Sequence, residues 1–184
     1  GRILAKTHPV EADLVVGVPE SGNPAALGYS MESGIPYGNA FIKNNYVGRT
    51  FIKPKQSQRE SSVKIKLNVI EEVVKGKRIV MVDDSIVRGT QLRETTEFLY
   101  RNGAKEVHIR PACPPLLYGC KYLNFSRSSS EMDLITRRVI DRLENGNVTD
   151  EVLQEYADPE SEKYETMVEE IRKELNFTSL RFNR

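Results

Sequence analysis

The chain has 184 residues, enough for one domain with a sizeable core. Its 27 basic and 26 acidic residues leave a net charge of only +1, so no global field marks a nucleic-acid or membrane partner. Two cysteines, Cys113 and Cys120, are too few for a disulfide framework, and no apolar run approaches the ~20 residues that span a bilayer. A reducing cytoplasm is the expected compartment.

Helical and strand patterns alternate through the first 43 residues. They predict the end of a helix, a buried strand, an Ala-rich helix and a second strand at residues 3–7, 14–18, 24–33 and 37–43. Pro19 ends the first strand, and Gly34 suits the C-terminal cap of the Ala-rich helix. The turn between the two, Glu20-Ser-Gly-Asn23, leads directly from a strand into a helix.

The periodic pattern disappears between residues 44 and 62. This segment is polar, and the wider stretch from Lys43 to Lys66 has seven basic residues against one acid. A structureless segment of this length in a compact domain is either functional or disordered. Its charge would attract an anion.

Apolar residues then return at a helical spacing. They predict a helix that begins at Ser61 or Ser62 and ends at Gly76. Its apolar positions are Val63, Leu67, Ile70 and Val74.

The stretch Arg78-Ile-Val-Met-Val-Asp-Asp-Ser-Ile-Val-Arg-Gly-Thr90 joins a buried strand to polar chemistry. Ile79–Val82 run without a polar break, as in a strand buried on both faces of a parallel sheet. Asp83 and Asp84 follow at the strand end, where open α/β sheets bind ligands. They suit a ribose diol or Mg²⁺, although helix capping is an alternative for one of them. The loop Ser85–Thr90 enters a helix, whose free N–H groups and positive dipole end suit a phosphate.

The rest of the chain completes an α/β alternation. Its patterns predict a helix at 90–102, a strand at 107–109, an irregular segment at 111–130, helices near 131–144, 150–157 and 160–174, and a closing strand at 178–182. Residues 131–174 carry fourteen acids against six basic residues, which indicates solvated helix surface. No Walker A or Gly-x-Gly-x-x-Gly pattern appears, so ATPase and dinucleotide-dependent functions lose their main support. Alternating strands and helices predict a parallel sheet.

Three segments together resemble a known family. Val82-Asp-Asp-Ser-Ile-Val-Arg-Gly-Thr90 resembles the phosphoribosyl-pyrophosphate (PRPP) motif of type I phosphoribosyltransferases, in the wording of the amidophosphoribosyltransferases. Asn44-Asn-Tyr-Val-Gly-Arg-Thr-Phe-Ile52 is similar to the start of their catalytic loop, and Val18-Pro-Glu-Ser-Gly22 to their pyrophosphate loop. The resemblance implies one phosphoribosyltransferase domain over residues 1–184. Its fold would be the type I α/β fold, a mainly parallel sheet flanked by helices, with a long flexible catalytic loop.

The resemblance also implies roles for particular residues. Asp83 and Asp84 would approach the ribose hydroxyls and Mg²⁺ of PRPP, Ser21 would lie near the metal, and Lys66 would contact pyrophosphate as the third catalytic residue. The implied substrate-binding residues are Glu20, Ser21, Gly22, Arg49, Lys66, Asp83, Asp84, Ser85, Ile86, Val87, Arg88, Gly89 and Thr90. The implied metal ligands are Ser21, Asp83 and Asp84.

Within the phosphate loop, two residues carry further expectations. Gly89 would let the backbone approach the phosphate closely. Arg88 would either pair with the phosphate or face solvent, and the sequence does not decide between these.

The implied reaction replaces the pyrophosphate of PRPP by ammonia and gives 5-phosphoribosylamine, the first step of purine biosynthesis. In the family, ammonia comes from glutamine on a preceding domain, which this sequence does not contain. We therefore expect the phosphoribosyltransferase part of a larger enzyme, without glutaminase activity. Purine nucleotides as feedback inhibitors and a homo-oligomeric assembly are further expectations from the resemblance.

Two other functions stay open at this point. One is a phosphoribosyltransferase that uses orotate or a purine base; the loop from Tyr46 to Ile52 favours ammonia instead. The other is a non-catalytic regulator that senses PRPP or a nucleotide, although no helix-turn-helix is evident. Some relatives hold an iron–sulfur cluster through four cysteines, which the two cysteines here do not support. Such a cluster stays open for the full-length protein, with Cys113 as one ligand and the others on segments outside this sequence. We expect Cys113 and Cys120 to be buried structural residues.

Overall fold

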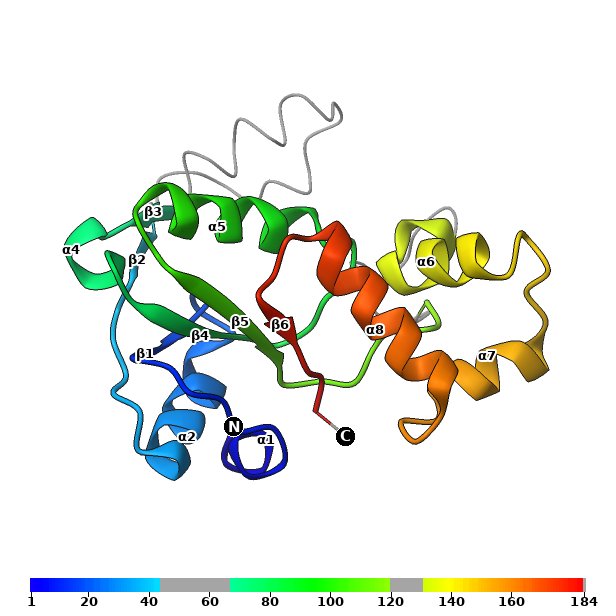
Figure 1. The fold of residues 1–184 in the computed structure, drawn as a ribbon, viewed down its shortest axis with the longest axis horizontal. Helices are drawn as coiled ribbons and strands as arrows, with labels where there is room; N and C mark the ends of the chain where they lie inside the picture. The colour runs from blue at the N-terminus through cyan, green and yellow to red at the C-terminus, as the bar shows by residue number, and fades with distance from the viewer. Residues whose placement is uncertain (44–66, 120–130, 184) are drawn as a thin grey trace.

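The computed structural model describes residues 1–43, 67–119 and 131–183, with helices and strands alternating along the chain (Figure 1). In chain order the elements are α1 (Arg2–Thr7), β1 (Leu14–Gly17), α2 (Asn23–Ser33), β2 (Phe41–Lys43), β3 (Leu67–Val69), α4 (Glu71–Val74), β4 (Arg78–Asp83), α5 (Thr90–Arg101), β5 (Glu106–Pro111), the 3₁₀ turn η2 (Glu131–Asp133), α6 (Ile135–Leu143), α7 (Asp150–Ala157), α8 (Glu162–Glu174) and β6 (Ser179–Leu180). Among these described residues, each helix is too short or too polar to cross a bilayer.

A parallel sheet occupies the centre of the described structure. Its four strands have the order β1–β4–β5–β6, and β4 pairs with β1 on one side and with β5 on the other. Val82 lies opposite Gly17 of β1 and Arg110 of β5. Because the strands are parallel, their carboxyl ends meet at one edge of the sheet, and the predicted α/β fold is confirmed.

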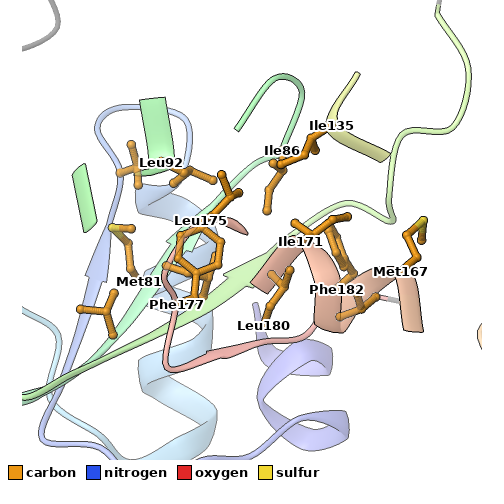
Figure 2. Packing of buried hydrophobic residues seen from close by; sticks show 14 of the residues in the cluster. Met81, Ile86, Leu92, Ile135, Met167, Ile171, Leu175, Phe177, Leu180 and Phe182 are labelled. Atoms are coloured by element: carbon orange, nitrogen blue, oxygen red, sulfur yellow. The ribbon is translucent and has the colours of Figure 1, made fainter. Parts of the chain in front are cut away.

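The two faces of β4 pack against different helical layers (Figure 1). Val80 and Val82 belong to a cluster with residues of α1 and α2, whereas Ile79 and Met81 belong to a larger cluster with residues of α5, α6 and α8. Figure 2 shows part of this larger cluster, to which Ile171 of α8 and Leu175, Phe177 and Leu180 of the segment after it contribute side chains together with Met81. A strand with both faces buried must be apolar throughout, which explains its unbroken apolar run.

The last two helices, α7 and α8, each begin at a capping side chain. The Thr149 hydroxyl accepts a hydrogen bond from Val152 N at 3.3 Å at the start of α7, and the Ser161 hydroxyl accepts one from Tyr164 N at 3.0 Å at the start of α8. Such capping satisfies amide groups that the first helical turn leaves unpaired. All fourteen acids from residue 131 to 174 are exposed or partly exposed, so the predicted solvated surface is confirmed.

The predicted strand at 37–43 is divided in two. Tyr37 forms an isolated parallel bridge with Val15 of β1, whereas β2 comprises only Phe41–Lys43 and belongs to a separate two-stranded sheet. Gly38 N donates to Val15 O at 2.9 Å, so the chain leaves the main sheet after one pair of contacts. The polar and irregular stretch between the two parts breaks what looked like one strand.

The predicted helix through Leu67, Ile70 and Val74 is wrong in its first part. Leu67–Val69 forms β3, antiparallel to β2, and the helix α4 spans only Glu71–Val74. The proposed start at Ser61 or Ser62 lies outside the described residues. Leu67 also fits a two-residue alternation with Val69, since Leu67 is buried, Asn68 is exposed and Val69 is partly buried, and pairing with β2 decides for the strand.

Candidate active site at the carboxyl edge of the sheet

The connections after β1 and β4 leave the sheet in opposite directions. β1 leads into α2 on one face, and its neighbour β4 leads into α5 on the other. In open α/β sheets, ligands bind at such a switch point, beyond the carboxyl ends of the strands. The N-termini of α2 and α5 both lie at this edge, so two positive dipole ends meet there.

Two adjacent carboxylates end β4 at this edge. Asp83 is only 7% exposed, whereas Asp84 is exposed. Asp84 N donates to Asp83 Oδ1 at 2.9 Å, and Ser85 N donates to Asp84 Oδ1 at 2.7 Å. The next segment holds their backbone in place, since Ala112 N donates to Asp83 O at 2.8 Å and Cys113 N to Asp84 O at 2.9 Å. The acid pair is therefore rigidly attached to both β4 and the end of β5.

The electrostatics of this pair suit a cation. Burial, together with the neighbouring charge of Asp84, raises the pKa of Asp83 to about 8. Within the described residues, neither carboxylate forms an ion pair with Lys or Arg. In the same part of the chain, no three His, Cys, Asp or Glu side chains cluster as metal ligands. Two carboxylates alone suit Mg²⁺, which takes one or two carboxylates and completes its shell with water and substrate phosphate.

After Ser85, the loop that ends at Thr90 presents backbone amides without partners among the described residues, called unpaired amides below. No backbone N–H from Ile86 to Leu92 donates a hydrogen bond to any described residue, whereas Arg93 N donates to Gly89 O at 2.9 Å. Gly89 has a left-handed φ of +80° and immediately precedes α5. The Ile86 side chain is buried in the cluster of Figure 2, so this residue can offer only its backbone to a ligand. Such a row of N–H groups is a binding surface for an anion.

The turn Glu20–Gly22 lies directly against the end of β4. Gly22 N donates to Val18 O, and Val18 N donates to Val82 O, both at 2.9 Å. A Cβ at Gly22 would lie 2.3 Å from Val82 O, so only glycine allows this approach. The structure therefore brings the predicted turn beside the strand end that carries Asp83.

The remaining predicted site residues have mixed outcomes. Arg49 and Lys66 lie outside the described residues. Arg88 is exposed, and its guanidinium donates to Asp133 Oδ2 at 3.1 Å, while the expected contact with phosphate stays a prediction. The expected burial of Cys113 is wrong: its backbone amide holds Asp84 O, and its side chain is exposed. Cys120 is not among the described residues.

Residues of α6 and of the segment after α8 form a wall behind the loop Ser85–Thr90, which sequence reasoning missed. Ile135 N, at the start of α6, donates to Val87 O at 2.9 Å. A Cβ on Gly89 would lie 2.8 Å from Ile135 Cδ1 and 2.9 Å from Leu175 Cδ2. Gly89 is therefore needed for packing against this wall, a role separate from the expected close approach to phosphate. These contacts join residues far apart in the sequence, so no local motif indicates them.

A cavity of about 430 Å³ lies at the opposite edge, by the amino ends of β1 and β4. Its charged groups pair with one another: Lys6 Nζ lies 3.4 Å from Glu32 Oε1, and Arg78 NH1 lies 3.5 Å from Glu11 Oε2. It lies beside the C-terminal ends of α1 and α2, where the helix dipole is negative, whereas the carboxyl edge has the N-termini of α2 and α5. The carboxyl edge is therefore the better candidate for an anionic substrate.

This fold and site correspond to a known class of protein. Residues 3–113 match the family described as the phosphoribosyl transferase domain, and the chain belongs to that family. Among individual relatives, the chain is 56% identical over 122 residues to the amidophosphoribosyltransferase of Mycobacterium tuberculosis. It is 50% identical over 139 residues to the amidophosphoribosyltransferase of Methanothermobacter thermautotrophicus. These alignments cover 66% and 76% of this chain, and 23% and 29% of the relatives.

Solved structures show the same similarity. Glutamine PRPP amidotransferase from B. subtilis, complexed with ADP and GMP, matches 98% of this chain at 41% identity with a TM-score of 0.70. A structure described as the allosteric regulatory enzyme of purine biosynthesis matches 100% at 40% identity with a TM-score of 0.71. The match covers 33% of each of those chains, so this chain spans about a third of their length.

Proposed function

We propose that this chain carries the PRPP-binding and phosphoribosyl-transferring part of an amidophosphoribosyltransferase. One observation carries the proposal: the acid pair Asp83–Asp84, the unpaired amides from Ile86 to Leu92 and the turn Glu20–Gly22 lie at one switch point. A phosphate, a ribose diol and a pyrophosphate each need one of these three features. The relatives named amidophosphoribosyltransferase support ammonia as the acceptor.

The amide row would bind the 5-phosphate of PRPP. Its N–H groups and the N-terminus of α5 offer several donors and a positive dipole end without any side-chain charge. The hydroxyls of Ser85 and Thr90 would add donors at the two ends of the loop. Because these groups are fixed by the backbone, they need little reorganisation when the substrate binds.

The acid pair would hold the ribose and Mg²⁺. Asp83 and Asp84 accept hydrogen bonds from ribose hydroxyls in this proposal, and with Ser21 they are the groups that would hold the metal. Bound Mg²⁺ would supply charge neutralisation for the pyrophosphate as it departs. Because the pKa of Asp83 is about 8 in the ligand-free chain, this carboxyl carries its proton at pH 7 until a cation or its complex with PRPP binds.

The turn Glu20–Gly22 and the N-terminus of α2 would receive the leaving pyrophosphate, together with Lys66 and Arg49. Displacement at the anomeric carbon by ammonia needs no protein nucleophile. Negative charge develops on the leaving group and positive charge on the sugar ring, so orientation and nearby cations account for most of the catalysis. Seven basic residues between Lys43 and Lys66 fit this role by charge.

The wider biology of the relatives extends the proposal. We propose that purine nucleotides regulate the protein of which this chain is part, since the B. subtilis enzyme is described in complex with ADP and GMP. Assembly into a homo-oligomer, a cytoplasmic location and a separate glutaminase domain as the source of ammonia belong to the same proposal. An iron–sulfur cluster is not included in it.

Product analysis tests the proposed function. The purified chain is supplied with PRPP, Mg²⁺ and either ammonia, orotate, a purine base or glutamine, and pyrophosphate release is followed. We expect release with ammonia at the highest rate, and no glutamate formation from glutamine. Faster turnover with a nucleobase would show a nucleobase phosphoribosyltransferase instead, and tight PRPP binding without turnover under any condition would favour a regulator.

A further inference from the structure

The loop Ser85–Thr90 is held from behind by two hydrogen bonds to its carbonyl groups. Ile135 N donates to Val87 O at 2.9 Å, and Arg138 NH2 donates to Arg88 O at 3.0 Å. Both donors belong to α6, which follows the loop by more than forty residues in the sequence. Neither carbonyl is therefore free to turn toward the side of the loop where the unpaired amides lie.

We propose that Arg138 is a positioning residue for this phosphate loop, an inference that rests on the proposed function of the loop. In a planar trans peptide, the C=O and the following N–H point in opposite directions. Fixing Val87 O toward α6 directs the amide of Arg88 away from α6, and fixing Arg88 O does the same for the amide of Gly89. Both amides belong to the row without partners among the described residues.

The contacts of Arg138 also explain why a positively charged side chain suits the positioning of this loop. Its NH1 group donates to Asp133 O at 3.2 Å and to Met132 O at 3.4 Å, and its NH2 group lies 3.8 Å from Glu174 Oε1 on α8. These contacts fix the guanidinium fork behind the loop. A charged donor binds the Arg88 carbonyl more strongly than a neutral one would, and it keeps this oxygen's negative end away from a phosphate dianion.

Arg142 provides a matched control within the same helix. It lies one turn after Arg138 and also pairs with α8, with NH1 3.1 Å from Glu174 Oε2 and NH2 3.8 Å from Glu170 Oε2. It makes no hydrogen bond to the loop among the described residues. Substitution of either arginine removes an ion pair between α6 and α8, but only substitution of Arg138 also removes a hydrogen bond to the loop.

Titration calorimetry of the 184-residue chain with two probes tests the proposal. The probes are ribose 5-phosphate, which would use the loop, and inorganic pyrophosphate with Mg²⁺, which would use the turn Glu20–Gly22. We expect Arg138→Met to weaken ribose 5-phosphate binding roughly tenfold, as for loss of one charged hydrogen bond, and to leave pyrophosphate binding within about twofold. Arg142→Met should leave both within about twofold, and Arg138→Lys should bind ribose 5-phosphate more tightly than Arg138→Met.

Four other results would count against the proposed role of Arg138. Equal weakening of both ligands by Arg138→Met would show a general structural role and overturn the inference, as would unchanged ribose 5-phosphate binding. Equal effects of Arg138→Met and Arg142→Met on ribose 5-phosphate would overturn it as well. If the unaltered chain binds neither ribose 5-phosphate nor PRPP, the proposed function itself fails, and the inference fails with it.

Discussion

Replacing Asp83 by Asn should stabilise the ligand-free chain while it abolishes binding of PRPP. The substitution keeps the side-chain volume and removes a charge that burial opposes. Burial beside Asp84 raises the pKa of Asp83 from the ordinary value of 3.8 to about 8. Between about pH 4 and pH 8 the folded chain therefore holds a proton that the unfolded chain releases, and the free energy of unfolding falls as the pH rises through this window.

The pKa sets an upper limit on the size of this effect. A rise from 3.8 to about 8 corresponds to at most about 6 kcal/mol, reached above pH 8 and absent below pH 4. The amide of Asn is itself buried and polar, and the native carboxylate accepts a hydrogen bond from Asp84 N, so the substitution recovers only part of it. We expect Asp83→Asn to gain about 1–3 kcal/mol at pH 9 and almost nothing at pH 4.

Urea unfolding at pH 4, 7 and 9 measures the effect, with Asp84→Asn as the control. Asp84 is exposed, so its substitution removes only the charge that acts on Asp83 and should have a smaller effect on stability. The reasoning is refuted if Asp83→Asn is less stable than the unaltered chain at pH 9. A gain in the free energy of unfolding that is the same at all three pH values would also contradict this explanation. The cost of burying the Asp83 carboxylate arises only when the group is ionised.

Three further predictions concern two glycines and one ion pair. Gly22→Ala should lower the free energy of unfolding in urea by about 2–3 kcal/mol, because its Cβ would lie 2.3 Å from Val82 O. Gly28→Ala, whose Cβ would have its nearest contact at 3.4 Å, should be neutral or stabilising. Equal effects of the two variants would contradict the close approach at Gly22. Gly89→Ala should lower the free energy of unfolding by about 1 kcal/mol more than Gly34→Ala. Both glycines have positive φ, but only a Cβ on Gly89 would contact Ile135 and Leu175 closely. A smaller difference would show that these two side chains move aside at little cost. The hydrogen-bonded Arg78 side chain holds the pKa of Asp13 down to about 2, so this pair's stabilisation is present above pH 4 and lost as the pH falls through 2. Asp13→Asn should therefore lower the melting temperature at pH 7 but not at pH 2, and a constant difference would refute the assignment.

The parts of the fold that the sequence predicts correctly are those with strong local signals. β1 and β4 are short apolar runs that are followed by Pro or end in Asp. The helix α2 has Pro near its start and Gly34, with a left-handed backbone, at its end. These signals depend on neighbours in the chain alone. β3 was mistaken for helix because Leu67 fits a helical spacing with Ile70 and Val74 as well as a two-residue alternation with Val69, and only pairing with β2 decides between the two.

The candidate site likewise has a part that the sequence predicts and a part that only the packing of distant residues reveals. The motif from Val82 to Thr90 is continuous, so its acids and its amide row follow from the sequence. Ile135 and Arg138 approach the loop only because α6 packs there, and no local spacing indicates that contact. The exposure of Cys113 was missed for a related reason: the segment after β5 is fixed by backbone bonds to Asp83 and Asp84 and does not bury its side chain.

The central claim is that PRPP binds at the switch point between β1 and β4. A map of backbone amide shifts in the NMR spectrum, recorded as PRPP and Mg²⁺ are added to the chain, measures this directly. We predict the largest shifts at the amides from Ile86 to Leu92 and at the turn Glu20–Gly22, with little change near Lys6 and Glu32 at the opposite edge. Shifts concentrated at that opposite edge, with the loop and the turn unaffected, would contradict the account.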